Sequence, residues 1–168
     1  MSDSDADPGS DPAAPTRADL RLAAMNLLAR REHSALELRE KLVRRFGEDP
    51  PVAERLDEAL AGLARDNLQS DERFAEAFVT MRQRQGKGPM RIDQELRQKG
   101  VADGLIATYL GQLDEDTWCE LARDVRQKRF GSEPVESRRD RAKQQRFLQY
   151  RGFTHEQIRS AMDERSFS

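Results

Sequence analysis

The chain has 168 residues, of which 36% are charged and only 6% are aromatic, and its formal net charge at pH 7 is −2. This composition is typical of a charge-rich helical protein with a thin core, and it argues against a β-sandwich, a barrel or a parallel sheet. No apolar run approaches the length that crosses a membrane, and the single cysteine, Cys119, cannot form an internal disulfide, so we expect a soluble cytoplasmic protein.

The first sixteen residues differ in composition from the rest of the chain. They contain four aspartates, no basic residue, and several Ser, Pro, Gly and Ala residues. Such a segment cannot bury an apolar core, and it lacks the basic and apolar regions of a signal peptide. We therefore predict that residues 1–16 are a disordered acidic tail. Without these four charges, residues 17–168 carry a net charge of +2.

The first half of the chain is predicted to form helices and no strands. Apolar residues recur every three or four positions, which is the period of an amphipathic helix. Ser34 and Glu37 have the spacing of a capping box, and Gly47 supplies a helix end. The first four helices are expected to begin at about Arg17, after Ser34, at Pro50, and at Ser70 or Asp71.

The second half of the chain continues the pattern. Gly88 and Pro89 predict the start of a fifth helix, because proline at the first helical position lacks only an N–H that would be unpaired anyway. Gly100 is expected just beyond its end, and Gly104 is a poor interior residue for a sixth helix. The last four helices are predicted over about 105–113, from Asp114 or Asp116 to Phe130, through Phe147 and Leu148 to Gly152, and after a capping box at Thr154.

Three similar sets of three helices follow one another. Leu42, Leu96 and Leu148 align in their middle helices, and a basic residue follows each leucine three positions later. Fixed spacing with matching helix ends indicates an internal repeat, and units of about 50 residues are too small to bury much core without stacking on neighbours. We therefore predict an all-α protein of three tandem three-helix repeats in an elongated, curved array. The repeats are expected over residues 17–69, 70–113 and 114–168.

Basic residues concentrate in the middle helix of each set. On a helical wheel, those of the eighth helix face away from Phe147 and Leu148, which suits phosphates or an acidic protein groove. A solvated helix face is the alternative interpretation. By contrast, the repeated basic residues Arg45, Lys99 and Arg151 are predicted to be buried-side partners of helix ends. The candidate binding residues are Arg138, Arg139, Arg141, Lys143 and Arg146, together with Arg91, Arg97, Lys41 and Arg44.

Residue types that support catalysis are scarce. The two histidines, His33 and His155, are far apart, and one cysteine cannot complete a metal site. The glycine-lysine-glycine segment at 86–88 lacks the spacing of a phosphate-binding loop. We therefore expect no enzyme, no metal and no cofactor.

Several motifs, in order, resemble the bacterial RecX family of RecA regulators. The resemblance extends over roughly Leu20 to Met162. The motifs that carry it are 27–34, continuing to Glu37-Leu38 and Lys41-Leu42; Asp71-Glu72-Arg73-Phe74-Ala75 followed by Arg82; Gly88-Pro89-Met90-Arg91-Ile92; Glu95-Leu96; Lys99-Gly100-Val101; and 147–153.

This resemblance implies a fold of three tandem three-helix repeats and a partner, the RecA–DNA filament, bound along its helical groove. It also implies suppression of the ATPase, strand-exchange and repressor-cleavage activities of RecA, and so a role in regulating DNA repair and recombination. We expect a monomer that has no membrane contact and that also meets single- or double-stranded DNA. Two alternatives are a stand-alone helical DNA-binding protein and a structural adaptor whose charge serves only solubility.

Overall fold

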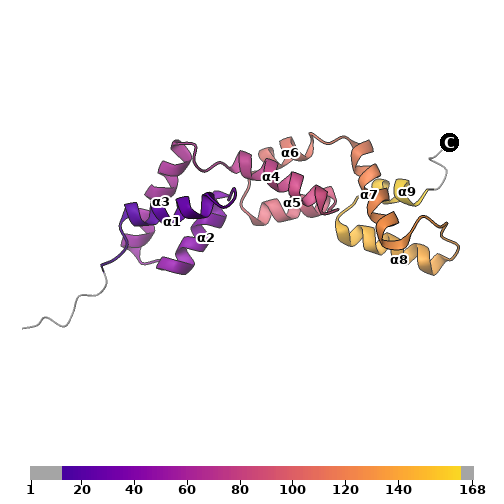
Figure 1. The fold of residues 1–168 in the computed structure, drawn as a ribbon, viewed down its shortest axis with the longest axis horizontal. Coiled ribbons are helices and arrows are strands. Elements are labelled where there is room, and N and C mark those ends of the chain that lie inside the picture. Colours follow the sequence, from indigo (N-terminus) through magenta and orange to yellow (C-terminus); the bar gives the residue numbers. More distant parts are fainter. Residues whose placement is uncertain (1–12, 164–168) are drawn as a thin grey trace, which may run out of the picture. The chain divides into compact units, whose positions relative to one another are not determined.

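The computed structural model describes residues 13–163, and the regular secondary structure in this part of the chain consists of helices, without a strand (Figure 1). The prediction of an all-α fold is confirmed. The helices are α1 (Arg17–Leu28), α2 (Ala35–Phe46), α3 (Pro50–Arg65), α4 (Asp71–Arg84), α5 (Pro89–Gln98), α6 (Asp103–Leu110), α7 (Glu115–Phe130), α8 (Arg138–Arg151) and α9 (His155–Met162).

Helices α1–α3 and α4–α9 belong to two compact units, divided after Ser70. In the first unit, α3 packs against both α1 and α2. Their apolar faces form one cluster that contains Leu20, Leu42, Leu56 and Leu63, all buried. The first three-helix set therefore has a core of its own.

The second unit has a single core to which all six of its helices contribute. The cluster extends in sequence from Phe74 to Met162 and includes Leu96, Trp118 and Leu148. Its closest packing is between α7 and α9, with further contacts within α4–α6 and between α8 and both α7 and α9. The predicted register of Leu42, Leu96 and Leu148 is confirmed, since all three side chains are buried.

The start of α1 corrects one detail of the predicted tail. Residues 1–12 lie outside the described residues. Thr16, however, caps α1: its hydroxyl accepts the N–H of Asp19, and the Asp19 carboxylate accepts the N–H of Thr16. Hydrogen bonding of the Asp19 carboxylate, first to the backbone N–H of Thr16 and then to the Thr16 side chain, lowers the pKa of Asp19. Arg55 of α3 also donates to the Pro15 carbonyl oxygen at 3.1 Å, so residues 15–16 take part in the folded unit.

The predicted helix ends at Gly47, Gly131 and Gly152 are confirmed, and each of these glycines has a positive φ. The apolar stripe at helical spacing predicted a first helix from about Arg17 to Arg31, but the backbone leaves the helix after Leu28 and turns before Ser34, whose hydroxyl caps α2.

The end of α8 lies beside the start of α5 (Figure 1), and backbone hydrogen bonds connect the two. The N–H of Gly88 donates to the Arg151 carbonyl oxygen at 2.8 Å, and the N–H of Met90 donates to that of Gly152 at 3.0 Å. The last carbonyls of one helix thus pair with the first N–H groups of another, and Pro89 between them has no N–H to satisfy. The two backbones approach so closely that a Cβ on Gly88 would overlap the Gly152 carbonyl, and one on Gly152 would overlap Arg91.

Candidate anion-binding interface

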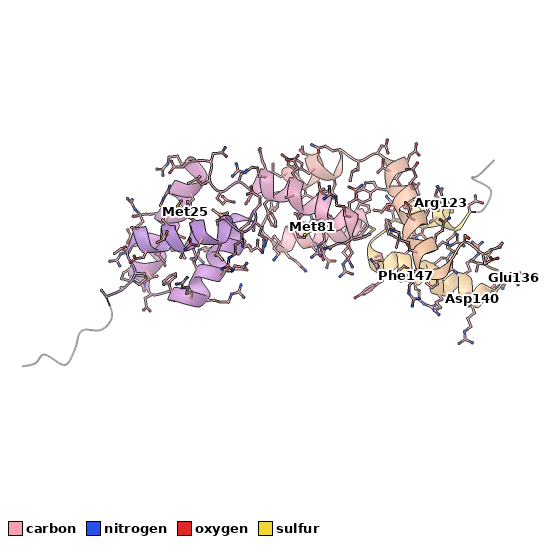
Figure 2. The ribbon with its side chains drawn as sticks, in the orientation of Figure 1. Met25, Met81, Arg123, Glu136, Asp140 and Phe147 are labelled. Atoms are coloured by element: carbon pink, nitrogen blue, oxygen red, sulfur yellow. The ribbon has the colours of Figure 1, made fainter. Side chains whose placement is uncertain are left out.

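Helix α8 presents the predicted basic face to solvent. Ser137 caps the helix by accepting the N–H of Asp140, and Gly152 ends it in the left-handed conformation. Leu148 is buried and the half-buried Phe147 packs edge-on against Phe130, with ring centroids 5.2 Å apart. Figure 2 labels Phe147 and Asp140 near opposite ends of α8. These contacts set the rotation of the helix and direct its basic side outwards.

Five cations of α8 are exposed and have no ion-pair partner within residues 13–163. The one acid of α8 is Asp140, in its first turn. Like charges three or four positions apart destabilise a helix by about 0.2–0.5 kcal/mol per pair, so this arrangement opposes helix stability. It also concentrates positive potential, which attracts anionic partners. The five residues are Arg138, Arg139, Arg141, Lys143 and Arg146, which we call the α8 basic face.

The predicted candidates on α5 are engaged within the protein. Arg91 is half-buried: its Nε lies 3.5 Å from a Glu95 carboxylate oxygen, and its Nη1 donates to the Tyr150 carbonyl oxygen at 3.3 Å. Its guanidinium also lies over the Tyr150 ring, 5.2 Å from the centroid. Arg97 is ion-paired with Asp93 of its own helix and with Asp103 of α6. Arg91 therefore joins α5 to α8, and Arg97 joins α5 to α6.

The candidates on α2 belong to the other unit. The Lys41 ammonium lies 3.0 Å from Nε2 of His33, and its side chain is half-buried. Arg44 is exposed and its Nε donates to the Glu40 carbonyl oxygen. The structure thus brings five of the nine predicted residues together on one exposed helix, where Arg141 borders the groove toward α9 and Lys143 the groove beside Phe130, while the other four lie on α5 and α2.

His33, the partner of Lys41, is buried. It is 2% exposed, and its Nδ1 lies 3.0 Å from the Arg31 carbonyl oxygen. Because an ammonium group only donates, Nε2 must accept from Lys41 and Nδ1–H must donate to Arg31. Burial is the main cause that lowers the pKa of His33, and the charges of Arg31 and Lys41 add to it, while the hydrogen bond to the Arg31 carbonyl and the Glu37 carboxylate oppose it only in part.

We expect the stability of the α1–α3 unit to fall as the pH decreases below about 6.5, the ordinary histidine pKa. The unfolded chain takes up a proton there that folded His33 refuses, so protons favour unfolding. The measurement is urea unfolding at pH 7.5 and 5.5. The pH dependence should diminish in His33→Gln and persist in His155→Gln, which removes the exposed histidine of α9. An equal pH dependence in His33→Gln and the parent protein would contradict this role.

The repeated basic residues have different surroundings. Arg151 donates to the Gln85 carbonyl oxygen at 3.1 Å and lies over the Phe147 ring, so it is a partner for the end of α4 rather than of its own helix. Lys99 is the half-buried residue that follows α5. Arg45 is exposed, beside the Phe46 ring, so the prediction that it lies on the buried side was wrong.

Two grooves of the α4–α9 unit were missed by the sequence analysis. One, of about 630 Å³, is lined by α5, the end of α8 and the start of α9, and includes Met90 and Tyr150. The other, of about 390 Å³, lies between α8 and α9 and includes Arg159. Tyr150 could have indicated these grooves from the sequence, because it is an aromatic residue two positions after the buried Leu148 and therefore lies on another side of α8.

Within residues 13–163, no three His, Cys, Asp or Glu side chains are placed to hold a metal ion. None of the helices in that range is both long enough and apolar enough to cross a membrane. Cys119 is free and half-buried.

Comparisons with known proteins agree on one family. The model of the second three-helix domain of RecX matches residues 70–110, and the model of the third matches residues 115–162. The chain is 49% identical over 142 residues to the regulatory protein RecX of Halorhodospira halophila, covering 84% of this chain and 85% of that protein. It is 44% identical over 139 residues to the regulatory protein RecX of Pseudomonas fluorescens, covering 83% and 86%.

Solved structures share the fold. The crystal structure of RecX from Lactobacillus salivarius superimposes with a TM-score of 0.71 at 21% identity, covering 87% of this chain and 94% of that one. A second crystal structure of the regulatory protein RecX gives the same TM-score at 27% identity, with coverage of 88% and 74%. The fold is therefore a tandem helical repeat.

Proposed function

This chain belongs to the RecX family, and we propose that it is a non-enzymatic negative regulator of the RecA recombinase that binds the RecA–DNA filament. The observation that carries the proposal is the α8 basic face, five exposed cations without ion-pair partners in the described part of the chain. A filament offers DNA phosphates and acidic protein side chains, which are the groups such a face attracts.

The proposed consequence is suppression of the ATPase, strand-exchange and repressor-cleavage activities of RecA. A ligand shifts a conformational equilibrium only through a difference in its affinity for the two states. If the monomer in the filament groove binds one arrangement of RecA subunits more tightly than another, it stabilises that arrangement. All three RecA activities would then fall together. The site of action is then the cytoplasm, where RecA assembles on chromosomal DNA.

The α8 basic face can be tested by charge reversal. The triple variant Arg139→Glu, Arg141→Glu and Arg146→Glu should lose filament affinity and show a shallower salt dependence, because fewer counterions are released on binding. Exposed substitutions of this kind change stability by less than about 0.5 kcal/mol each, so the variant should stay folded. The measurement is co-sedimentation with RecA filaments at several salt concentrations, paired with thermal melts.

A matched control changes the net charge equally in the other unit. Arg17, Arg30 and Arg65 are exposed residues of the first unit, and their reversal should leave filament binding nearly unchanged. Equal filament binding by both triple variants and the parent protein would mean that the α8 basic face is only a solvated surface, as in the alternative of a structural adaptor. Binding to naked DNA as tight as to filaments would instead favour a stand-alone DNA-binding protein.

A further inference from the structure

The two grooves of the α4–α9 unit adjoin. Gln149, His155 and Ile158 line both, so the groove between α8 and α9 lies next to the groove beside α5. We call this pair of adjoining grooves the α8–α9 track. One of its halves is strongly basic, and the other carries an exposed aromatic side chain.

The basic half is lined by three arginines. Arg141 and Arg146 come from α8 and Arg159 from α9, and no Asp or Glu lines this groove. All three are exposed, and within residues 13–163 none of them forms an ion pair. A helix end explains only Arg159, which lies in the last turn of α9, whereas Arg141 and Arg146 lie inside α8. Three uncompensated cations along a groove match the charge of a phosphate backbone.

The aromatic half is centred on Tyr150, whose side chain is 75% exposed. The core does not explain this residue, because so exposed a ring buries little surface. Arg91 holds the ring from the neighbouring helix, and Arg91 is itself held by Glu95 and by the Tyr150 carbonyl. Arg91 thus restrains the ring before any ligand arrives, which lowers the entropy lost on stacking. Met90, 61% exposed, lines the same groove.

We propose that the α8–α9 track binds a single strand of nucleic acid, with its phosphates on Arg141, Arg146 and Arg159 and a base stacked on Tyr150. The inference rests on the proposed function in taking the DNA strand of the filament as that ligand. A basic groove next to an exposed aromatic ring is how proteins hold single strands, since every base has a face that can stack. In a duplex the bases are paired and stacked internally, so Tyr150 could not reach a face. Nine residues of helix separate Arg141 from Tyr150, a rise of about 14 Å, so the track accommodates a short strand.

The stacking step has a specific test. Binding of a short fluorescent oligothymidine is measured by anisotropy with the full chain, together with the same strand carrying abasic sites. Tyr150→Ala should weaken binding about 5- to 150-fold, the range expected for the loss of one stacked base. Tyr150→Phe should bind like the parent protein. The abasic strand should bind the parent protein weakly, and Tyr150→Ala should no longer distinguish the two strands.

The phosphate step is separated from stacking by its salt dependence. The double variant Arg141→Gln and Arg146→Gln should lower the slope of log affinity against log salt by about 1.4, from two phosphate contacts on a single strand. Tyr150→Ala should leave that slope unchanged, because stacking releases no counterions. Leu22→Ala, at a 59% exposed residue of α1, is the matched control for truncating an exposed apolar side chain and should change neither quantity.

Four results would overturn the track. One is equal affinity of Tyr150→Ala and the parent protein for the oligothymidine. Another is equal binding of duplex and single strand with the same dependence on Tyr150. The third is a loss of filament binding in Tyr150→Ala with oligothymidine binding intact, which would assign Tyr150 to a protein contact. Filament binding by a parent protein that ignores the oligothymidine would remove the track and keep the proposed function. Oligothymidine binding without filament binding would keep the track and remove the proposed function.

Discussion

Replacing Gly152 with alanine should lower the free energy of unfolding of the α4–α9 unit by about 2–5 kcal/mol. Two costs combine at this residue. Gly152 has a φ of 98°, where a side chain is strained, and an added Cβ would overlap the backbone and Cβ of Arg91. Relief of that overlap requires α8 and α5 to separate, which would lengthen the hydrogen bond from Met90 to the Gly152 carbonyl. The measurement is chemical unfolding followed by circular dichroism.

Other glycines of the same unit separate the two costs. Gly88→Ala has the steric overlap without a positive φ and should cost about 1–3 kcal/mol. Gly131→Ala has the positive φ with open space around the Cβ and should cost about 1–2 kcal/mol. Gly104→Ala has neither cost and should stabilise α6 by up to about 1 kcal/mol. Equal stability of all four variants would mean that the two helix ends do not meet as described.

Truncation of Leu96 to alanine should cost about 2–5 kcal/mol, because its side chain is fully buried in the core of the α4–α9 unit. The core of α1–α3 shares no residue with that cluster. Hydrogen exchange should therefore accelerate in α4–α9 and remain nearly unchanged in α1–α3. Loss of one repeat is expected to spread through shared core rather than through the whole chain.

Met90→Ala is the matched control for Leu96→Ala, since it truncates a large apolar side chain on the same helix where that side chain is mostly exposed. It should change stability by less than about 0.5 kcal/mol. Leu42→Ala should have the converse effect of Leu96→Ala and accelerate exchange in α1–α3. Uniform acceleration along the chain in all of these variants would contradict two separate cores.

The local signals in the sequence were sufficient for the helices and the leucine register. Glycines at 47, 131 and 152 end helices because left-handed backbone favours glycine, and Ser34 and Thr154 begin them because their hydroxyls accept N–H groups that the helix cannot pair. The positions of Leu42, Leu96 and Leu148 predicted burial because a helix buries the side that carries its apolar residues.

The sequence did not show which groups the charged residues contact. A helical wheel places Arg91, Arg97 and Lys41 around their own helix axes, but it does not say that Tyr150, Asp103 or His33 lies opposite.

The sequence by itself determined the helices, the buried leucines, the family and the exposure of the α8 cations, because these follow from local patterns within single segments. Only the tertiary structure decided that Gly88 and Gly152 meet at a helix junction, that Arg91 holds Tyr150, and that two grooves adjoin beside α8. Each of these depends on two segments about 60 residues apart or on three helices at once, and no local pattern encodes which segments pack together.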